Sequence, residues 1–558
     1  MNVNKSAARW PGLMCLILCV ACLPGCSVPG PEGQADSFGV DFSLPPGATT
    51  GGAIVFVVDG VNAEIFDQML QAGRLPAVKK YFVDRGLYAP RAVTGIPSVT
   101  LSNMTTLVTG RFPGHHDIVG NNWFDRNQLI LRDLATIRQK NRLDADYLAP
   151  NLYEQFPDRT TFSMFLQPHR NATKFFEDRL TAGPAFFMDW FDFVDRLTLF
   201  RLNQAMGLAR SRKEFPAVTT VYMLAPDFMA YKHGALSAEY RDAIEHTDRQ
   251  IGRVLGDLER AGLLDKTHIA LVSDHGHAQV ADTLRMDAFL RLQGLDLAAE
   301  RLSERTPFEV RMRAYDGHCA VLAGSGERYC ALYLRKPVCI DGKPAGWEPW
   351  PARPWADDLG HYPVARPSGL FGQPRPGRID LLRLLTDQPG VDAIAYAALP
   401  DAVRVRRNTG EVEFRQEGGA GAPISYRIIA GDDPLGYKGK VSDEALAGAP
   451  MTGRQWLAQT LATEFPDLPA QIVAYFRSRR AGDVAIFASP GYDLADHIKS
   501  GHGSLRQADM CVPMLLAGPG VPHKTIDVAR GADLMPTLLE LLGKPIPPGV
   551  DGQSLVEK

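Results

Sequence analysis

The 558-residue chain has no excess of basic residues, few cysteines and a single long apolar run, which lies at its start. Its 60 Lys and Arg are matched by 63 Asp and Glu, so the net charge is −3. Proteins that coat nucleic acids need a large excess of Lys and Arg to displace phosphate counterions, so binding to a nucleic-acid duplex is not expected. No internal repeat is visible. The hydrophobic fraction of 45% is enough to bury a core and excludes wholesale disorder.

The start of the chain is typical of an export signal over residues 1–25. Lys5 and Arg9 precede the apolar run Leu13–Leu23, which is too short to span a bilayer comfortably. The following Leu-Pro-Gly-Cys26 resembles a bacterial lipobox, in which the cysteine is lipidated and becomes the first mature residue. We therefore expect a lipoprotein of the bacterial cell envelope, anchored by Cys26 on the periplasmic side or in the outer membrane. The proline departs from the small residues usual there, so cleavage by an ordinary signal peptidase is the alternative.

Four cysteines remain after the signal and Cys26, and their spacing does not resemble a metal knuckle. In an oxidising envelope, a disulfide among Cys319, Cys330 and Cys339 is one expectation, with Cys330 and Cys339 paired by proximity. Buried free thiols, including Cys511, are the other expectation.

Five continuous apolar runs are typical of strands that are buried on both faces, as in parallel sheets. Helical stretches lie between them, the clearest running from Ser237 to Gly262 with apolar positions three to four residues apart. Strands that alternate with helices predict an α/β fold with a doubly wound, mostly parallel sheet flanked by helices. The five runs are Ala53–Val58, Thr219–Leu224, His268–Ser273, Val484–Ala488 and Val512–Ala517.

The composition divides the mature chain into four segments. Residues 26–50 are a Pro- and Gly-rich tether, and residues 51–290 carry the first three apolar runs. From residue 291 to 482 Pro, Gly and Arg crowd around short strand-like pieces. Because apolar runs resume at Val484, we interpret 291–482 as an inserted α+β cap domain and 483–558 as the last part of the catalytic core.

Potential metal ligands follow four of these runs. Ligands of open α/β sheets collect at the carboxyl ends of strands, and mixed carboxylates and imidazoles suit zinc and similar divalent ions. Taken singly, each residue has an ordinary explanation as a helix cap, a turn residue or a surface loop. Their joint placement favours a metal site. The residues are Asp59, Asp227, Asp274, His275 and His502.

Thr100 is a candidate nucleophile because it lies where a turn bounded by Pro97 should enter a helix. A hydroxyl there would meet backbone N–H groups and the positive end of the helix dipole, which favour a phosphate. A bound metal ion can convert such a hydroxyl, a weak nucleophile at neutral pH, into an alkoxide. Thr100 could instead serve only as a helix cap, and Ser98 and Ser102 are rival hydroxyls.

As a set, these segments resemble the alkaline phosphatase superfamily, and within it the type I phosphodiesterase/nucleotide pyrophosphatase family. The resemblance covers roughly residues 53–280 and 484–556, and its motifs are highly specific as a set. They are Val57-Val-Asp59-Gly, Thr100-Leu-Ser-Asn103 through Leu107-Val-Thr-Gly110 to Gly120-Asn-Asn, Ala225-Pro-Asp227, Val272-Ser-Asp-His-Gly276, Gly501-His-Gly503 and the closing segment 529–543.

The resemblance implies a site with two divalent ions, expected to be zinc, about 4 Å apart. Asp59, Thr100, Asp274 and His275 match the nucleophile and ligand positions around one ion. Asp227 and His502 match two ligands of the other ion. Asn103 matches the residue that, beside the Thr100 amide, steadies a non-bridging phosphoryl oxygen.

The implied activity is hydrolysis of a small-molecule or lipid phosphate ester through a phospho-Thr100 intermediate. Phosphodiester or nucleotide pyrophosphate bonds are the expected substrates, with monoesters left open. A sulfatase would need a Cys/Ser-x-Pro-x-Arg motif, which the nucleophile segment lacks. The alternative from another class is a lipid-anchored envelope binding protein whose second metal site has degenerated.

One position departs from the family pattern, which usually has a histidine four residues after the aspartate. Here Tyr231 follows Asp227 at that spacing, and His233 comes two residues later. We expect His233 to be displaced into the role of the missing ligand, with Tyr231 or water as alternatives. His277 could be a spare ligand but is interpreted as a surface residue or one that supports the ligands.

Groups that select the substrate are expected in the cap and in residues 140–215. The aromatic segment Phe186–Phe193 could stack on a nucleobase or line a lipid pocket, although core packing is the commoner use of such residues.

Overall fold

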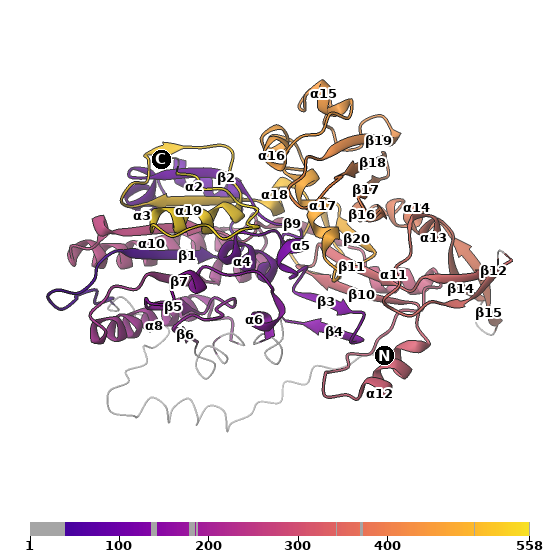
Figure 1. Cartoon of the computed structure of the whole chain (residues 1–558), viewed down its shortest axis with the longest axis horizontal. Helices are drawn as coiled ribbons and strands as arrows, with labels where there is room; N and C mark the ends of the chain where they lie inside the picture. Colours follow the sequence, from indigo (N-terminus) through magenta and orange to yellow (C-terminus); the bar gives the residue numbers. More distant parts are fainter. Residues whose placement is uncertain are drawn as a thin grey trace. The chain divides into compact units, whose positions relative to one another are not determined.

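Two large β-sheets organise the part of the chain that the computed structural model describes (Figure 1). The described residues are 39–134, 142–177, 185, 188–341, 343–368, 372–495 and 497–556. The expected signal peptide and Cys26 lie outside them, as does the first half of the expected tether. Both sheets belong to one unit, which comprises residues 40–558.

The first sheet has eight strands and is mostly parallel. Strand β1 is its centre and pairs in parallel with both β7 and β8. This confirms the predicted α/β class. In spatial order the strands are β24 (Lys524–Thr525), β2 (Leu87–Val93), β23 (Cys511–Ala517), β8 (Thr267–Val272), β1 (Gly52–Val58), β7 (Val218–Met223), β5 (Thr161–Met164) and β6 (Lys174–Phe176).

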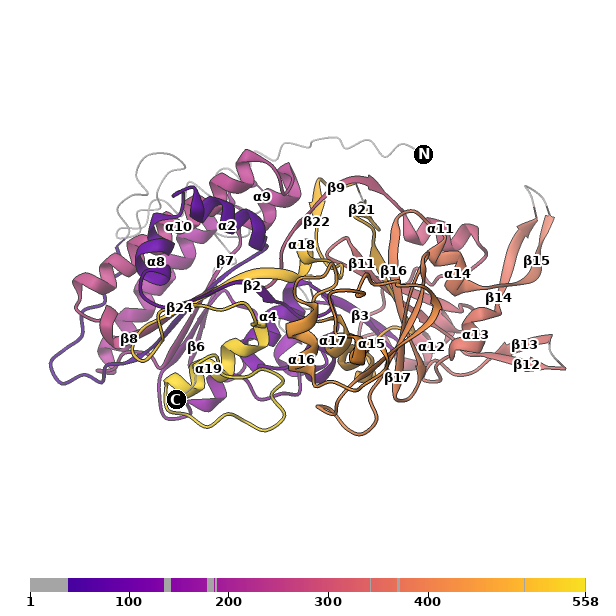
Figure 2. The same ribbon diagram turned by 90° about the horizontal axis from the view of Figure 1, so that it is seen from above.

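Helices cover both faces of this sheet, because alternate side chains of its central strand are apolar on both sides. Val55 and Val57 of β1 pack into one hydrophobic cluster together with residues of α4 (Thr100–Thr109) and α19 (Leu534–Leu541). Phe56 and Val58 pack into another cluster with residues of α2 (Ala63–Gln71), α8 (Phe191–Ser211) and α10 (Ala238–Arg260). Figure 2 shows these two groups of helices on opposite faces of the sheet.

Helix α10 begins and ends close to the predicted residues. The side chain of Ser237 caps its first turn by accepting a hydrogen bond from the N–H of Tyr240, and the helix ends at Arg260. The other helices are α3 (Pro76–Val78), α5 (Pro113–His116), α6 (Leu143–Asp146), α9 (Ala225–His233), α11 (Met286–Leu292), α12 (Phe308–Asp316), α13 (Ala356–Gly360), α14 (Leu381–Thr386), α15 (Asp443–Leu446), α16 (Gly453–Thr460), α17 (Leu468–Arg477) and α18 (Gln507–Met510), with shorter helical turns at Lys79–Val83, Tyr153–Gln155, Leu264–Lys266 and Gly531–Asp533.

The second sheet has seven strands, and its described pairs are antiparallel. Most of its strands lie within residues 291–482, the region whose composition differs from that of the rest of the chain. In spatial order its strands are β10 (Ala320–Ser325), β11 (Tyr329–Leu334), β20 (Val484–Ala488), β16 (Val391–Leu399), β17 (Ala402–Arg407), β18 (Gly410–Arg415) and β19 (Ser425–Gly431).

The prediction that Val484–Ala488 belongs to the first sheet is wrong. This strand, β20, lies inside the second sheet between β11 and β16. Ala485 and Phe487 pack into one hydrophobic cluster, whereas Val484 and Ile486 pack into another. An antiparallel strand that is covered on both faces has the same continuous apolar sequence as a parallel one, which explains the error. The boundaries proposed at residues 290 and 482 stay predictions.

Strand β23 does belong to the first sheet but runs against its neighbours. Its pairings with β8 and β2 are both antiparallel. Its first residues therefore lie at the edge where the parallel strands end, and the N–H of Gly276 donates to the carbonyl of Asp509 just before β23. The loop after β8 is held by this contact.

Small sheets complete the fold. The one that matters for the site joins β9 (Ala278–Thr283) to β22 (Ser500–Gly501) and to β21 (Gly491–Asp493). It connects the loop after β8 with a loop more than 200 residues later. The two-stranded sheets are β3 (Asn122–Asp125) with β4 (Ile130–Asp133), β12 (Pro337–Ile340) with β13 (Lys343–Trp347), and β14 (Tyr362–Ser368) with β15 (Gly372–Ile379).

The four described cysteines are free thiols. Cys319, Cys330 and Cys511 are buried, and Cys339 is exposed. Of the two expectations for these cysteines, the structure has the free thiols and not the disulfide. Within the described ranges, no helix combines the length and apolarity needed to cross a membrane.

Candidate metal centre

The carboxyl ends of β1, β7 and β8 bring three aspartates to one edge of the first sheet. Asp59 and Asp274 follow β1 and β8 closely, and these neighbouring strands pair Val57 with Val272. Asp227 is the third residue of α9, which begins two residues after β7 ends. All three residues are buried, with at most 4% of their surface exposed.

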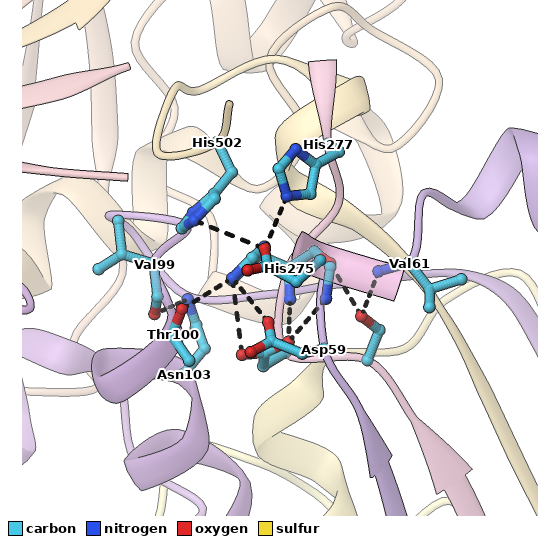
Figure 3. A network of polar contacts seen from close by, with 12 residues as sticks. Asp59, Val61, Val99, Thr100, Asn103, His275, His277 and His502 are labelled. Carbon is cyan, nitrogen blue, oxygen red and sulfur yellow. Dashed lines mark hydrogen bonds and ion pairs between the residues drawn. The ribbon is translucent and has the colours of Figure 1, made fainter. Parts of the chain in front are cut away.

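His275 lies between the hydroxyl of Thr100 and two of these carboxylates. Its Nε2 is 3.0 Å from Oγ1 of Thr100, 3.2 Å from Oδ1 of Asp59 and 3.6 Å from Oδ2 of Asp274. Its Nδ1 lies 3.0 Å from the carbonyl oxygen of Gly276, to which it can donate. The imidazole is thereby oriented with Nε2 toward the acids (Figure 3).

Asp59, Asp274 and His275 form the first group of side chains able to hold a metal ion. Within the described residues, Oδ1 of Asp59 and Oδ2 of Asp274 are buried without a hydrogen-bond partner. Tyr222, on β7, donates its hydroxyl to the other oxygen of Asp59. Buried carboxylate oxygens without donors are costly unless a cation compensates them, so this group fits a divalent ion.

Asp227, His275, His277 and His502 form the second such group. One ligand atom from each lies within 4.8 Å of the others. Nε2 of His277 is 2.6 Å from Oδ1 of Asp227, and Nε2 of His502 is 4.0 Å from the same oxygen. The rings of His275 and His502 stack with centroids 3.5 Å apart. Imidazole nitrogens and a carboxylate are donor types that zinc accepts.

Pairing of β9 with β22 explains why His277 and His502 meet. Ala278 pairs with Gly501 in an antiparallel register, so the residues just beyond this pair, His277 and His502, lie side by side. The main chain of His502 is in turn bonded to the turn between β10 and β11: its N–H donates to the carbonyl of Gly326. The second sheet thus positions one of the histidines.

Hydrogen bonds from the rest of the chain orient these two imidazoles. Nδ1 of His502 lies 2.8 Å from the carbonyl oxygen of Ser98. Nδ1 of His277 lies 3.0 Å from Oγ of Ser500. Metal-bound histidines generally use their second nitrogen in this way, which sets the ring orientation.

Burial controls the proton affinities of the site. It raises the pKa of Asp227 and Asp274 well above the ordinary value, and the neighbouring Asp59 raises them further. It lowers the pKa of His277 and His502 well below the ordinary value. The imidazoles of His277 and His502 are therefore neutral and able to bind a metal ion. A bound cation would stabilise the ionised carboxylates of Asp227 and Asp274.

His275 differs from the other two histidines. Burial by itself would lower its pKa, but the nearby Asp274 and Asp59 raise the pKa to about 10. In the absence of a metal ion, a proton on His275 would partly balance these acids, and an ion would replace it.

Of the three candidate hydroxyls, Thr100 is the one with access to the site. It is the first residue of α4 and is partly exposed, with its Oγ1 against His275. Ser98 is fully buried and donates its hydroxyl to the carbonyl of Ser504 at 2.8 Å. Ser102 is also fully buried. Thr100 is not the cap of α4, because Val99 occupies that position.

The structure gives Asn103 a different role from the predicted one. Its side-chain amide is buried and bonded to main-chain atoms of the preceding loop, accepting from the N–H of Gly95 and donating to the carbonyls of Pro97 and Val99. Because these bonds occupy both ends of the amide, Asn103 holds the loop before Thr100 and is not free to contact a phosphoryl group.

Asn121 is the asparagine that lies beside the nucleophile. Its Oδ1 accepts a hydrogen bond of 2.9 Å from the N–H of Leu101, the residue after Thr100. Its Nδ2 has no partner within the described ranges and the residue is partly exposed, so the amide can donate to a bound anion. The signal for it was present in Gly120-Asn-Asn, one of the segments that carry the family resemblance.

The structure does not bring His233 to the site. It is the last residue of α9, its side chain is 28% exposed, and its Nδ1 lies 3.7 Å from Glu239. Helical geometry separates it from Asp227, since six residues do not return to the same face. The prediction that His233 replaces the missing ligand is therefore not supported.

His277, interpreted from sequence as a surface or supporting residue, is instead a buried member of the second group. The sequence signal was weak. His277 is two residues after His275, and nothing local indicates that the chain enters β9 with this side chain turned toward Asp227.

The aromatic segment is described only in part, since Phe186 and Phe187 lie outside the described residues. Phe191 is buried and stacks on Phe228 with ring centroids 4.7 Å apart. At this position the aromatic ring serves core packing.

Comparison of the sequence with known families adds an independent observation. A sequence model described as type I phosphodiesterase / nucleotide pyrophosphatase matches residues 53–336, about half of the chain. The chain belongs to this family. The match contains Asp59, Thr100, Asp227 and His275, whereas His502 lies beyond its end.

Individual relatives are distant. Ectonucleotide pyrophosphatase/phosphodiesterase family member 1 of Mus musculus is 25% identical over 242 residues, and family member 3 of Bos taurus is 25% identical over 243. Venom phosphodiesterase 2 of Crotalus adamanteus is 25% identical over 247 residues. Each alignment covers 42% or 43% of this chain but only 25% to 28% of the relative.

Proposed function

We propose that the chain is a metal-dependent hydrolase of phosphate esters that acts through a phospho-Thr100 intermediate. Phosphodiester or nucleotide pyrophosphate bonds are the preferred substrates, as the names of its relatives suggest. The observation that carries the proposal is the position of Thr100. Its hydroxyl is partly exposed, opens a helix and lies 3.0 Å from His275, which is common to both groups of metal-binding side chains.

One ion would be held by Asp59, Asp274 and His275, with Thr100 beside them. Asp227 and His502 would belong to the site of the other ion. We expect zinc at both sites, because the donors are nitrogen and carboxylate oxygen. Bound there, the ions would supply Lewis-acid activation of the hydroxyl and neutralise charge on the phosphoryl group.

The chain's own groups then account for positioning and bond exchange. The N-terminus of α4 and the amide of Asn121 face an anion held at Thr100 and favour its negative oxygens. The oxygen of Thr100 loses its proton to water and bonds to phosphorus while the bond from phosphorus to the leaving oxygen breaks. Water then attacks the phospho-Thr100 ester, which restores the hydroxyl and releases the phosphoryl product.

The activity is tested by assaying purified protein with its metal content measured. Phosphodiesters, nucleotides, phosphomonoesters and sulfate esters are compared at equal concentration. Turnover of diesters or nucleotide pyrophosphates above the other classes is expected. If the protein binds its metal ions but turns over no phosphate ester, the alternative of a lipid-anchored binding protein replaces this proposal.

We also propose that the chain is a bacterial envelope lipoprotein anchored through Cys26. The proposal depends on the basic start, the short apolar run and the lipobox-like ending of residues 1–26. Wild-type protein should partition into detergent with membranes, and Cys26→Ala should lose both lipid and processing. Recovery of wild type as a soluble protein that is cleaved at another residue would contradict the anchor.

A further inference from the structure

The second ion lacks a protein ligand if only the residues expected from the family pattern are counted. Nδ1 of His275 is directed at the carbonyl of Gly276, so this histidine has only Nε2 to offer. That nitrogen lies near Asp59 and Asp274 and so serves the first ion. Asp227 and His502 alone leave the second ion two donors short of the usual four.

His277 is placed to supply the missing nitrogen. Its imidazole is almost fully buried, with 1% of the residue exposed, and its Nε2 lies 2.6 Å from Oδ1 of Asp227. The carboxylate of Asp227 is thus within reach of both His277 and His502. The hydroxyl of Ser500 is hydrogen-bonded to Nδ1 of His277, as expected for a metal ligand whose ring orientation is fixed.

Tyr231 lies on α9, one helical turn after Asp227. Its ring meets His277 edge-on, with centroids 4.9 Å apart, and meets His502 at 5.7 Å. The Tyr231 ring therefore packs against both imidazoles.

We propose that His277 is the third protein ligand of the second metal ion, in place of the histidine that the family pattern puts one turn after Asp227. The donor then comes from the residue just before β9 instead of from helix α9. Tyr231 occupies the position on α9 where the family pattern has a histidine. This inference depends on the metal centre of the proposed function and concerns how its second ion is held.

A simple hydrogen bond between His277 and Asp227 is the competing interpretation. It would stabilise the loop without any contact to an ion. The two interpretations differ in metal stoichiometry and in the spectrum of a bound metal, neither of which requires a substrate.

The test measures bound metal in the full-length protein and in four variants. His277→Ala should lower the zinc content from about two ions to about one per chain and weaken binding of the second ion by at least about 100-fold. His233→Ala is the matched control, because this histidine lies on neighbouring α9 but is partly exposed and outside both groups. It should keep two ions, as should Tyr231→Phe.

His277→Cys provides a positive signal that does not depend on loss of binding. Loaded with cobalt(II), it should show a thiolate-to-cobalt charge-transfer band that the wild type and His233→Ala lack. Two tightly bound ions in His277→Ala, or cobalt-loaded His277→Cys without this band, would overturn the proposal. If the wild type itself binds two ions but cleaves no phosphate ester, the proposed function fails while the ligand assignment stands.

Discussion

The hydroxyl of Thr100 lies 3.0 Å from Nε2 of His275, across the edge where β1 and β8 end. This relationship joins the start of a helix to a histidine 175 residues later. It distinguishes Thr100 from Ser98 and Ser102, which are fully buried.

Thr100→Ala should lower turnover by roughly 10³-fold or more while metal content and folding stay close to wild type, because only the attacking oxygen is removed. Thr100→Ser should keep part of the activity. Turnover is measured with a phosphodiester, and trapping of a phosphorylated protein is measured by mass spectrometry. Ser98→Ala, which removes a buried hydroxyl, should not block phosphorylation; an inactive Ser98→Ala with an active Thr100→Ala would reverse the assignment.

Gly60→Ala should weaken metal binding, because Gly60 touches Asp227. A Cβ at this position would lie 2.8 Å from both Cα and Cβ of Asp227, and the backbone has φ of +70°. Gly73→Ala is a matched control with φ of +73° and open space around the added carbon. Both substitutions should cost about 1–2 kcal/mol of stability through the left-handed backbone. Only Gly60→Ala should also lose bound metal and activity; equal metal content in the two variants would refute this.

Asp195 on α8 should make the unfolding free energy depend on pH. It accepts hydrogen bonds from the N–H groups of Leu224 and Ala225 at the start of α9. Burial raises its pKa well above the ordinary value, even though the bond from Leu224 lowers it. The folded state therefore keeps a proton that the unfolded state releases. The contribution of this group to stability is complete below about pH 4 and is lost as pH rises through the raised pKa.

Asp195→Asn cannot ionise, so its unfolding free energy should fall less than that of the wild type between pH 5 and pH 8. Urea denaturation at several pH values measures both slopes. Parallel curves for the two proteins would show that Asp195 does not titrate in this range.

Removal of metal should destabilise the protein, because a proton on His275 would balance the surrounding acids only in part. The linkage relation gives about 4 kcal/mol of stabilisation when free ion is 1,000 times its Kd. Denaturation midpoints are measured with a chelator, with the chelator preloaded with zinc, and after zinc is added back. A midpoint that is the same under all three conditions would mean that no ion binds the folded state selectively.

A thiol reagent should label one of the four described cysteines in the folded protein. Cys339 is exposed, whereas burial raises the pKa of Cys319 to about 11 and that of Cys511 to about 12. The buried thiols should react only after unfolding. Mass spectrometry of the labelled protein counts the modified residues. Absence of labelling at Cys339, restored by a reductant, would instead indicate the disulfide with Cys330.

Local sequence was sufficient to predict the placement of the residues that closely follow strands β1 and β8 of the first sheet. Asp59 and Asp274 were predictable as neighbours because parallel strands end at one edge, so a polar residue after each apolar run must lie near the others. Helix α10 was predictable because its cap and its apolar periodicity are both local. The family resemblance likewise depended on short segments near Asp59, Thr100 and His275.

Contacts between segments far apart in the sequence determined the remaining features of the site and the fold. Whether His233 or His277 faces Asp227 depends on the register of β9 with β22, which joins residues more than 200 positions apart. Which asparagine lies beside Thr100 with an amide free to donate depends on a hydrogen bond from Leu101 to Asn121. Strand β20 is covered on both faces in the second sheet, so its composition could not indicate which sheet it joins. These choices follow from tertiary packing, because burial and hydrogen-bond partners are supplied by chain segments that a local pattern does not contain.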